Sequence, residues 1–245
     1  MAVDLTRAAV VVAHPDDEIL WFSSLAPKVR RIVMCYGAIS PRSQRAENRR
    51  KLVEAYPLDT VEFLDLPIPG AAAAADPLHL AALADRLGPA LEGITTVFTH
   101  NPWGEYGQAD HRRVHAAIEA LRHDHGFAVY VSGYVARHQR AELDLALRRG
   151  VGDVVSYPTA KTEIGRIVRL YKAHSCWTWT PHWSWPKREH FLRLDGGAAT
   201  RPPEIPIHLF GSRHKSRAEM RQFWRRLFGA RPKELLVAIP ARGDG

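Results

Sequence analysis

Short apolar runs alternate with helical patterns over the first 135 residues. The apolar runs are typical of buried strands, which we expect at 7–14, 31–37, 60–67, 94–101 and 127–135. Apolar spacings of three and four residues predict helices at 18–29, 43–56, 78–92 and 110–124. Continuous apolar strands that alternate with helices predict an α/β fold, a Rossmann-like parallel sheet with helices on both faces.

The pattern weakens after residue 135. A helix is expected at 159–175, and residues 196–206 read as a linker or long loop. Apolar residues then return at helical spacing opposite arginines, which predicts a basic amphipathic C-terminal helix. We therefore expect a catalytic domain over 1–195 and, over 196–245, a linker and helical extension that packs on the domain or at an oligomer interface.

A polar cluster interrupts the first strand–helix transition. His14, Pro15, Asp16, Asp17 and Glu18 follow four apolar residues, and apolar residues resume at once. Acids favour a helix N-terminus, so capping explains one or two of them. Three adjacent carboxylates repel one another unless a cation lies among them, so the cluster predicts a divalent metal at the carboxyl edge of the sheet.

A zinc hydrolase site uses three ligands from His and Asp or Glu and leaves one position for water. The cluster offers His14 and one carboxylate. His111 can point inward from the start of the helix over 110–124, because it shares a face with Val114 and Ile118. His115 lies one turn later and could also face the site, although we expect it to be a helix histidine with solvent access.

These residues carry a resemblance to a known family. The segments "AHPDDE" (13–18) and "GEYGQADHRRVH" (104–115) resemble those of the LmbE/PIG-L family of zinc-dependent N-deacetylases, and the similarity spans roughly residues 8 to 192. The resemblance implies hydrolysis of an N-acyl group, expected to be N-acetyl, on an amino sugar or glycoconjugate. It implies Zn²⁺ as cofactor, held by His14, Asp17 and His111.

The resemblance also assigns roles around the metal. Asp16 would be the general base that takes a proton from a metal-bound water. Tyr106 would help to stabilise the oxyanion, Asp110 would orient its neighbours, and Arg45 would bind substrate in preference to Arg49. One position departs from the family pattern, since Gln108 stands where a histidine is usual. An amide can donate a hydrogen bond but cannot deliver a proton.

Four of the seven tryptophans lie within 177–185. Core packing or a subunit interface explains such a cluster, and a platform for a sugar ring or flat aglycone is the functional alternative. We expect at least one of the four to contact substrate, and we assign Trp177 to that role.

Composition limits the remaining alternatives. The net charge of +8 comes almost entirely from 211–233, which holds eight Lys or Arg and one Glu. Clustered charge without a nucleic-acid motif does not support nucleic-acid binding. No apolar run is long enough for an integral membrane segment. The two cysteines, Cys35 and Cys176, form no disulfide framework, which favours a cytoplasmic location. A homo-oligomer, an amide hydrolase for an antibiotic or nucleotide sugar, and a non-catalytic sugar-binding protein stay open.

Overall fold

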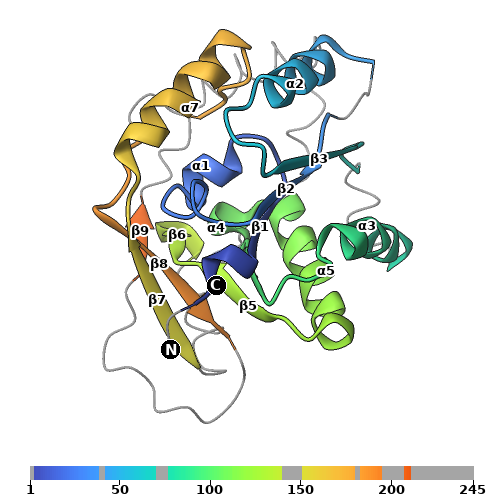
Figure 1. The fold of residues 1–245 in the computed structure, drawn as a ribbon, viewed down its shortest axis with the longest axis vertical. Coiled ribbons are helices and arrows are strands. Elements are labelled where there is room, and N and C mark those ends of the chain that lie inside the picture. The colour runs from blue at the N-terminus through green and yellow to red at the C-terminus, as the bar shows by residue number, and fades with distance from the viewer. Residues whose placement is uncertain are drawn as a thin grey trace, which may run out of the picture. The chain divides into compact units, whose positions relative to one another are not determined.

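A computed structural model describes residues 3–38, 42–69, 77–139, 151–179, 183–194 and 207–210. Its helices and strands alternate over the first two thirds of the chain (Figure 1). In chain order they are η1 (Leu5–Arg7), β1 (Ala8–Val12), α1 (Asp17–Trp21), β2 (Arg31–Tyr36), α2 (Gln44–Glu54), β3 (Val61–Leu66), α3 (Pro77–Ala90), β4 (Thr96–Thr99), α4 (Gly104–Gly107), α5 (Ala109–His125), β5 (Ala128–Ser132), β6 (Tyr134–Ala136), η3 (Arg137–Gln139), β7 (Asp153–Pro158), α7 (Lys161–Ala173), β8 (Arg188–Arg193) and β9 (His208–Phe210).

The described residues form a seven-stranded sheet in the order β3-β2-β1-β4-β5-β8-β7. The first five strands in this order are parallel, with Val11 of β1 level with Val33 of β2 and Thr99 of β4. Strand β8 runs antiparallel to both of its neighbours. The predicted α/β class is therefore confirmed, with a mixed sheet in place of an all-parallel one.

Helices cover both faces of the sheet. Successive side chains of β1 point to opposite faces, so each face packs against its own set of helices. Ala8, Val10 and Val12 pack with apolar residues of α1, α2 and α7, whereas Ala9 and Val11 pack with those of α3 and α5. All five residues of β1 are buried. A strand covered on both faces reads as a continuous apolar run, as the sequence of β1 does.

The strand order places a switch point between β1 and β4. The chain moves outward from β1 through β2 to β3 and then returns to the other side of β1 with β4. Ligands of open α/β sheets bind in the crevice beyond the carboxyl ends of the strands at such a point. The polar cluster that starts at His14 follows β1, and the loop that starts at His100 follows β4.

Two predicted elements are shorter than expected. The helix predicted over 18–29 ends at Trp21, and the Glu189 carboxylate then accepts hydrogen bonds from the Ser23 hydroxyl at 2.8 Å and the Ser24 backbone N–H at 2.7 Å. The strand predicted over 127–135 breaks at Gly133, whose N–H donates to the His190 carbonyl at 2.9 Å. In both places a residue of β8, distant in sequence, takes the backbone hydrogen bond.

Strands β7, β8 and β9 were not predicted. Every residue of β7 is partly or fully exposed, and β8 has the sequence "REHFLR" with four ionisable residues, so neither shows the apolar run of a buried strand. Strand β9 pairs in parallel with β6 in a second, two-stranded sheet. These residues become strands because partners already in place accept their backbone hydrogen bonds.

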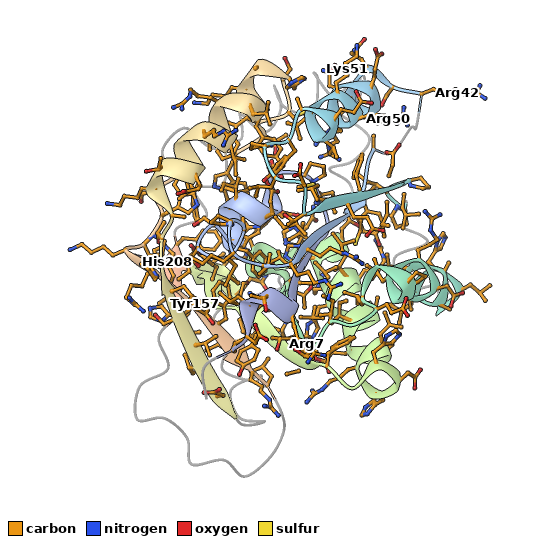
Figure 2. The ribbon with its side chains drawn as sticks, viewed as in Figure 1. Arg7, Arg42, Arg50, Lys51, Tyr157 and His208 are labelled. Atoms are coloured by element: carbon orange, nitrogen blue, oxygen red, sulfur yellow. The ribbon has the colours of Figure 1, made fainter. Side chains whose placement is uncertain are left out.

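Helix α2 divides a buried face from a charged one. Ala46, Arg49 and Leu52 are buried, while Arg50 and Lys51 lie on the outer side (Figure 2). The predicted linker over 196–206 and the basic helix beyond 211 fall outside the described residues. Within the described part of the chain, no helix combines the length and the apolar character that crossing a bilayer requires.

Candidate metal and catalytic centre

The polar cluster sits where β1 ends and α1 begins. Asp16 occupies the N-cap of α1 with φ 103°, a left-handed backbone conformation that few residues other than glycine adopt. Asp17 and Glu18 form the first turn of the helix, and both are buried. Strain of this kind is retained where the surrounding structure enforces it, and it is common at functional sites. The turn aims consecutive acidic side chains in different directions.

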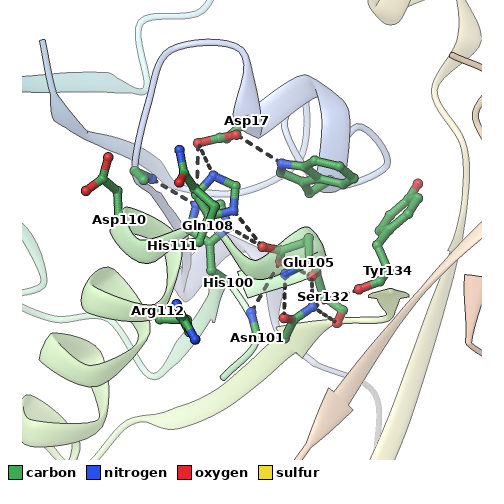
Figure 3. A network of polar contacts seen from close by, with 12 residues as sticks. Asp17, His100, Asn101, Glu105, Gln108, Asp110, His111, Arg112, Ser132 and Tyr134 are labelled. Atoms are coloured by element: carbon green, nitrogen blue, oxygen red, sulfur yellow. Dashed lines mark hydrogen bonds and ion pairs between the residues drawn. The ribbon is translucent and has the colours of Figure 1, made fainter. Parts of the chain in front are cut away.

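Three ligand atoms converge at this edge of the sheet, from His14, Asp17 and His111. Figure 3 shows two of these residues, Asp17 and His111. Asp17 Oδ2 lies 3.3 Å from His14 Nδ1 and 3.3 Å from His111 Nε2. The donor atoms of these three residues all lie within 4.8 Å of one another. Two ligands of a tetrahedral zinc ion with bonds of about 2.0–2.1 Å stand about 3.3 Å apart, so the spacing fits such an ion.

The unpartnered nitrogen of His111 supports the same interpretation. Its Nε2 is buried and has no hydrogen-bond partner among the described residues. A buried polar atom without a partner is costly, and a metal ion at that position would satisfy it. One carboxylate and two imidazoles are also the donor types that zinc takes in hydrolases. The residues present therefore fit the ion that the family resemblance implies.

Each histidine of the trio has a carboxylate on its other nitrogen. His14 Nε2 lies 3.1 Å from Asp110 Oδ2, and His111 Nδ1 lies 2.7 Å from Glu105 Oε2. Because an ionised carboxylate only accepts, we assign the proton to these two nitrogens. In the neutral imidazoles that a metal requires, that assignment leaves His14 Nδ1 and His111 Nε2 as the ligand atoms. Carboxylates behind metal-binding histidines fix the tautomer and the ring orientation in this way.

Glu105 is the centre of a fully bonded network (Figure 3). Its Oε2 accepts from His111 and, at 3.1 Å, from His100 Nδ1. Its Oε1 accepts from the Ser132 hydroxyl and from the Asn101 backbone N–H. Burial raises the pKa of Glu105, but the two histidines outweigh it and lower the pKa to about 2. Glu105 itself has φ 52°, a second strained position at this site.

His100 belongs to this network but not to the ligand trio. Its ring stacks on the His111 ring with the centroids 3.8 Å apart. Its Nε2 accepts the Ala13 backbone N–H at 2.9 Å, and its Nδ1 donates to Glu105, so both nitrogens are occupied. His100, Glu105 and His111 can be grouped as a second set of metal donors, yet both histidine Nδ1 atoms already bond to Glu105 Oε2.

Sequence reasoning gave no role to His100 or Glu105. The signal was present in part, because His100 directly follows the buried strand β4. His115, for which we expected solvent access, is mostly covered, and burial lowers its pKa to about 4.

Asp16 lies beside the ligands without joining them. Its Oδ2 accepts from the Thr178 hydroxyl at 2.7 Å. Burial and the neighbouring Asp17 charge raise its pKa to about 6, while Thr178 and His14 act in the opposite direction. The carboxylate is therefore within electrostatic reach of two of the proposed ligands.

Glu18, the third acid, braces the turn. It accepts from the Tyr56 and Tyr171 hydroxyls, each at 2.8 Å, and from the Asp16 backbone N–H at 3.0 Å. Burial raises its pKa to about 7 although these hydrogen bonds lower it. Its carboxylate binds Tyr56, which follows α2, and Tyr171 of α7. Asp16, Asp17 and Glu18 therefore each have different partners.

Tyr106 and Gln108 flank the centre. The centroid of the Tyr106 ring lies 5.5 Å from that of His111 and 5.4 Å from that of Trp179. Burial, followed by the charges of Asp17 and its neighbours, raises the pKa of Tyr106 well above its usual value, so the phenol stays protonated and can donate. Gln108 caps α5, and its amide oxygen accepts the Ala109 N–H at 3.1 Å. Its amide nitrogen is the group left to donate.

The two candidate arginines differ in placement. Arg45, the assigned substrate contact, is exposed on α2. Arg49 is 2% exposed and donates to the Gly37 carbonyl. Arg49 is also among the charges that lower the pKa of Asp16, which brings it within electrostatic reach of the centre.

The tryptophan segment packs against the centre from the side of α7. Trp179 lies edge-on to Trp21 with the ring centroids 5.2 Å apart, and the Trp21 indole N–H donates to Asp17 Oδ1 at 3.0 Å. Trp177, the residue assigned to substrate, is half-buried against Tyr171 and Trp185. Trp183 lies as close to Trp21, with the ring centroids 5.3 Å apart, and Trp179 is the one of the two whose ring also contacts Tyr106.

The fold can be compared with solved structures. It is similar to the A40926 pseudoaglycone deacetylase Dbv21, at 11% identity and a TM-score of 0.53 over 78% of this chain and 97% of that one. It is also similar to a deacetylase of teicoplanin biosynthesis in complex with teicoplanin, at 11% identity and a TM-score of 0.52 over 77% and 98% of the chains. A "bog" complex of a deacetylase from that pathway has 14% identity and a TM-score of 0.53 over 78% and 99%.

Comparison of the sequence with protein families and with curated proteins gives no match. At this level of identity the likeness concerns the backbone alone, and the chain has the fold of these deacetylases.

Proposed function

We propose that this protein is a zinc-dependent hydrolase that removes an N-acyl group, N-acetyl first, from an amino sugar or glycoconjugate. The observation that carries the proposal is the convergence of His14, Asp17 and His111, with the His111 Nε2 unpartnered, beside a fourth group, Asp16, that is not a ligand. A ligand trio with an adjacent free carboxylate is the arrangement that metal-assisted hydrolysis needs.

His14 Nδ1, Asp17 Oδ2 and His111 Nε2 would hold the metal, which when bound would supply Lewis-acid chemistry toward water and the amide carbonyl. The protein supplies the rest. Asp16 accepts the proton of the attacking water and returns it to the amide nitrogen as the C–N bond breaks, so that acetate and a free amine leave. Because Gln108 cannot deliver a proton, Asp16 serves as both base and acid.

Hydrogen-bond donors from the protein are also needed to stabilise the negative charge that develops on the carbonyl oxygen. Tyr106, which stays protonated, and the Gln108 amide are the neutral donors at the border of the site. Asp110 holds the ring of His14 and is itself held by Arg113, whose guanidinium donates to it at 2.6 Å. Asp110 therefore acts by orienting a ligand, as the family resemblance implies.

The substrate class rests on the resemblance and on the aromatic border. Aromatic side chains such as Trp179 and Tyr106 next to the ligands suit a sugar ring or a flat aglycone. The proteins of similar fold are described as an A40926 pseudoaglycone deacetylase and a deacetylase of the teicoplanin biosynthesis pathway, which supports an amino sugar carried on a larger molecule. Hydrolysis of an amide on another small molecule, such as an antibiotic, is the alternative.

The first experiment measures bound metal and acyl release together. Protein purified without added metal should hold about one zinc per chain, and with zinc it should release acetate from N-acetylglucosaminides. His111→Ala should lose the metal, whereas Asp16→Asn should keep it and lose turnover. His79→Ala, an exposed histidine on α3, is the matched control and should behave as the parent. A parent that binds no metal tightly would overturn the proposal and favour a non-catalytic sugar-binding role.

A further inference from the structure

The end of α7 turns back toward Asp16. Helix α7 ends at Ala173, and Ser175 adopts a left-handed conformation with φ 55°. The Cys176 N–H then donates to the Tyr171 carbonyl at 2.8 Å and the Ser175 N–H to the Lys172 carbonyl at 3.1 Å. This pair of bonds is the Schellman helix end, which normally uses glycine at the left-handed position. The reversal carries Thr178 to the carboxylate of Asp16.

The returning segment contacts Asp16 at two points. The Tyr171 hydroxyl accepts the Asp16 backbone N–H at 2.8 Å, and the Thr178 hydroxyl donates to Asp16 Oδ2 at 2.7 Å. The first contact supports the strained backbone of Asp16, and the second determines how its carboxylate is turned. Neither contact is predictable from local pattern, because 155 and 162 residues separate the partners.

We propose that Thr178 is a positioning residue for Asp16: its hydroxyl holds Oδ2 and leaves Oδ1 to take the proton of the attacking water. This inference rests on the proposed function, in which Asp16 is the base. No other described residue donates to this carboxylate through a hydrogen bond from its side chain. A carboxylate joined to a turn through two rotatable bonds needs such a contact to keep one orientation.

The test compares two substitutions at the same position. Thr178→Val keeps the shape and removes the hydroxyl, whereas Thr178→Ser keeps the hydroxyl. Losing a hydrogen bond to a charged group lowers kcat by about tenfold in the valine variant. We expect KM and bound zinc to stay within twofold of the parent, and the serine variant to recover most of kcat. Thr178 is exposed, so both variants should fold.

Thr6 provides a matched control. Its hydroxyl donates to Asp4 Oδ1 at 2.7 Å, the same bond between the same residue types, on an exposed segment before β1. Thr6→Val should leave kcat unchanged. A fall in kcat that appears equally in the Thr6 and Thr178 valine variants would contradict a specific role for Thr178. A rise in KM or a loss of bound zinc with kcat unchanged would contradict it as well.

A readout other than activity separates this inference from the proposed function. Crystal structures of the metal-free parent and of Thr178→Val should show the Asp16 carboxylate in one orientation in the parent and rotated or split in the variant. An unchanged Asp16 orientation in Thr178→Val would overturn the inference whether or not the enzyme is active. If the orientation changes but the zinc-loaded parent releases no acyl group, the positioning contact stands and the proposed reaction fails.

Discussion

Each carboxylate at this site has a different set of contacts, and residue type alone does not show which. Asp17 offers a ligand oxygen, Asp16 is held free beside it, and Glu18 binds two tyrosines. Glu105 is the least expected of them, because it uses both oxygens to hold His100, His111 and their surroundings. Its charge decides which nitrogen of His111 carries the proton, and therefore which nitrogen is left for a metal.

Glu105→Gln should weaken zinc binding by about 10–100-fold, because the amide carries no charge and its NH2 group cannot accept, so one of the two accepting atoms of Glu105 is lost and the His111 tautomer is less strongly enforced. Competition with a zinc-sensitive dye would measure the affinity. Glu47→Gln, an exposed partner of Lys51 on α2, is the control and should bind zinc as the parent does. Equal zinc affinity in Glu105→Gln would show that this carboxylate does not hold the ligand.

At the scale of elements, the break between β5 and β6 is a packing feature. Gly133 lies so close to β8 that an added Cβ would meet the His190 carbonyl oxygen at 2.6 Å. A backbone carbonyl cannot move aside in the way that the end of a flexible side chain can. Glycine is therefore needed here to let two strands approach, and the same break frees β6 to pair with β9.

Gly133→Ala should lower the free energy of unfolding by about 1–3 kcal/mol, because the new methyl group forces β5 and β8 apart. Gly165→Ala, within α7, should have the opposite effect on stability. There the added Cβ meets nothing nearer than an Arg169 side-chain nitrogen at 3.6 Å, so helix propensity should raise stability by about 0.5–1 kcal/mol. Denaturant unfolding followed by circular dichroism would measure both. Equal effects in the two variants would contradict the close-approach argument.

At the scale of the whole described unit, the proposed metal joins segments that are distant in the chain. His14 and Asp17 follow β1, whereas His111 lies in the first turn of α5. An ion held by all three binds the native state and not the unfolded chain, so it stabilises the fold by mass action. In the metal-free protein, burial lowers the pKa of His111, but Asp17 and Glu105 outweigh it and raise the pKa to about 10.

Zinc should therefore raise Tm, and the increase should grow with pH from 6 to 8. Below a pKa of about 10, His111 is protonated in the metal-free native state, and zinc must displace that proton. The proton stabilises the metal-free fold most fully below the unfolded pKa of about 6.5, so competition is strongest in acid. Thermal scans with zinc and with a chelator would measure the shift. A pH-independent shift, or one retained by His111→Ala, would contradict the assignment.

The sequence by itself determined the alternating strands and helices and the position of the polar cluster. Burial on both faces demands continuous apolar runs, and those runs are visible in β1 and β4. Because parallel strands end at one edge, the residues after them could be placed together before the structure was known. That reasoning brought the polar cluster after β1 and the residues after β4 to one edge, and the family resemblance selected His14, Asp17 and His111 among them. The geometry of these three residues fits the expected metal.

Only the tertiary structure decided what surrounds those three residues. Glu105 and Thr178 carry no local pattern that marks them, and His100 is marked only by its place after β4. Strands β7 and β8 lack the apolar runs of buried strands. Their roles depend on which backbone and side-chain groups the crossovers bring within about 3 Å, across separations as long as that from Asp16 to Thr178. Periodicity reports which face of an element is buried. It does not report which atom on another element will meet it there.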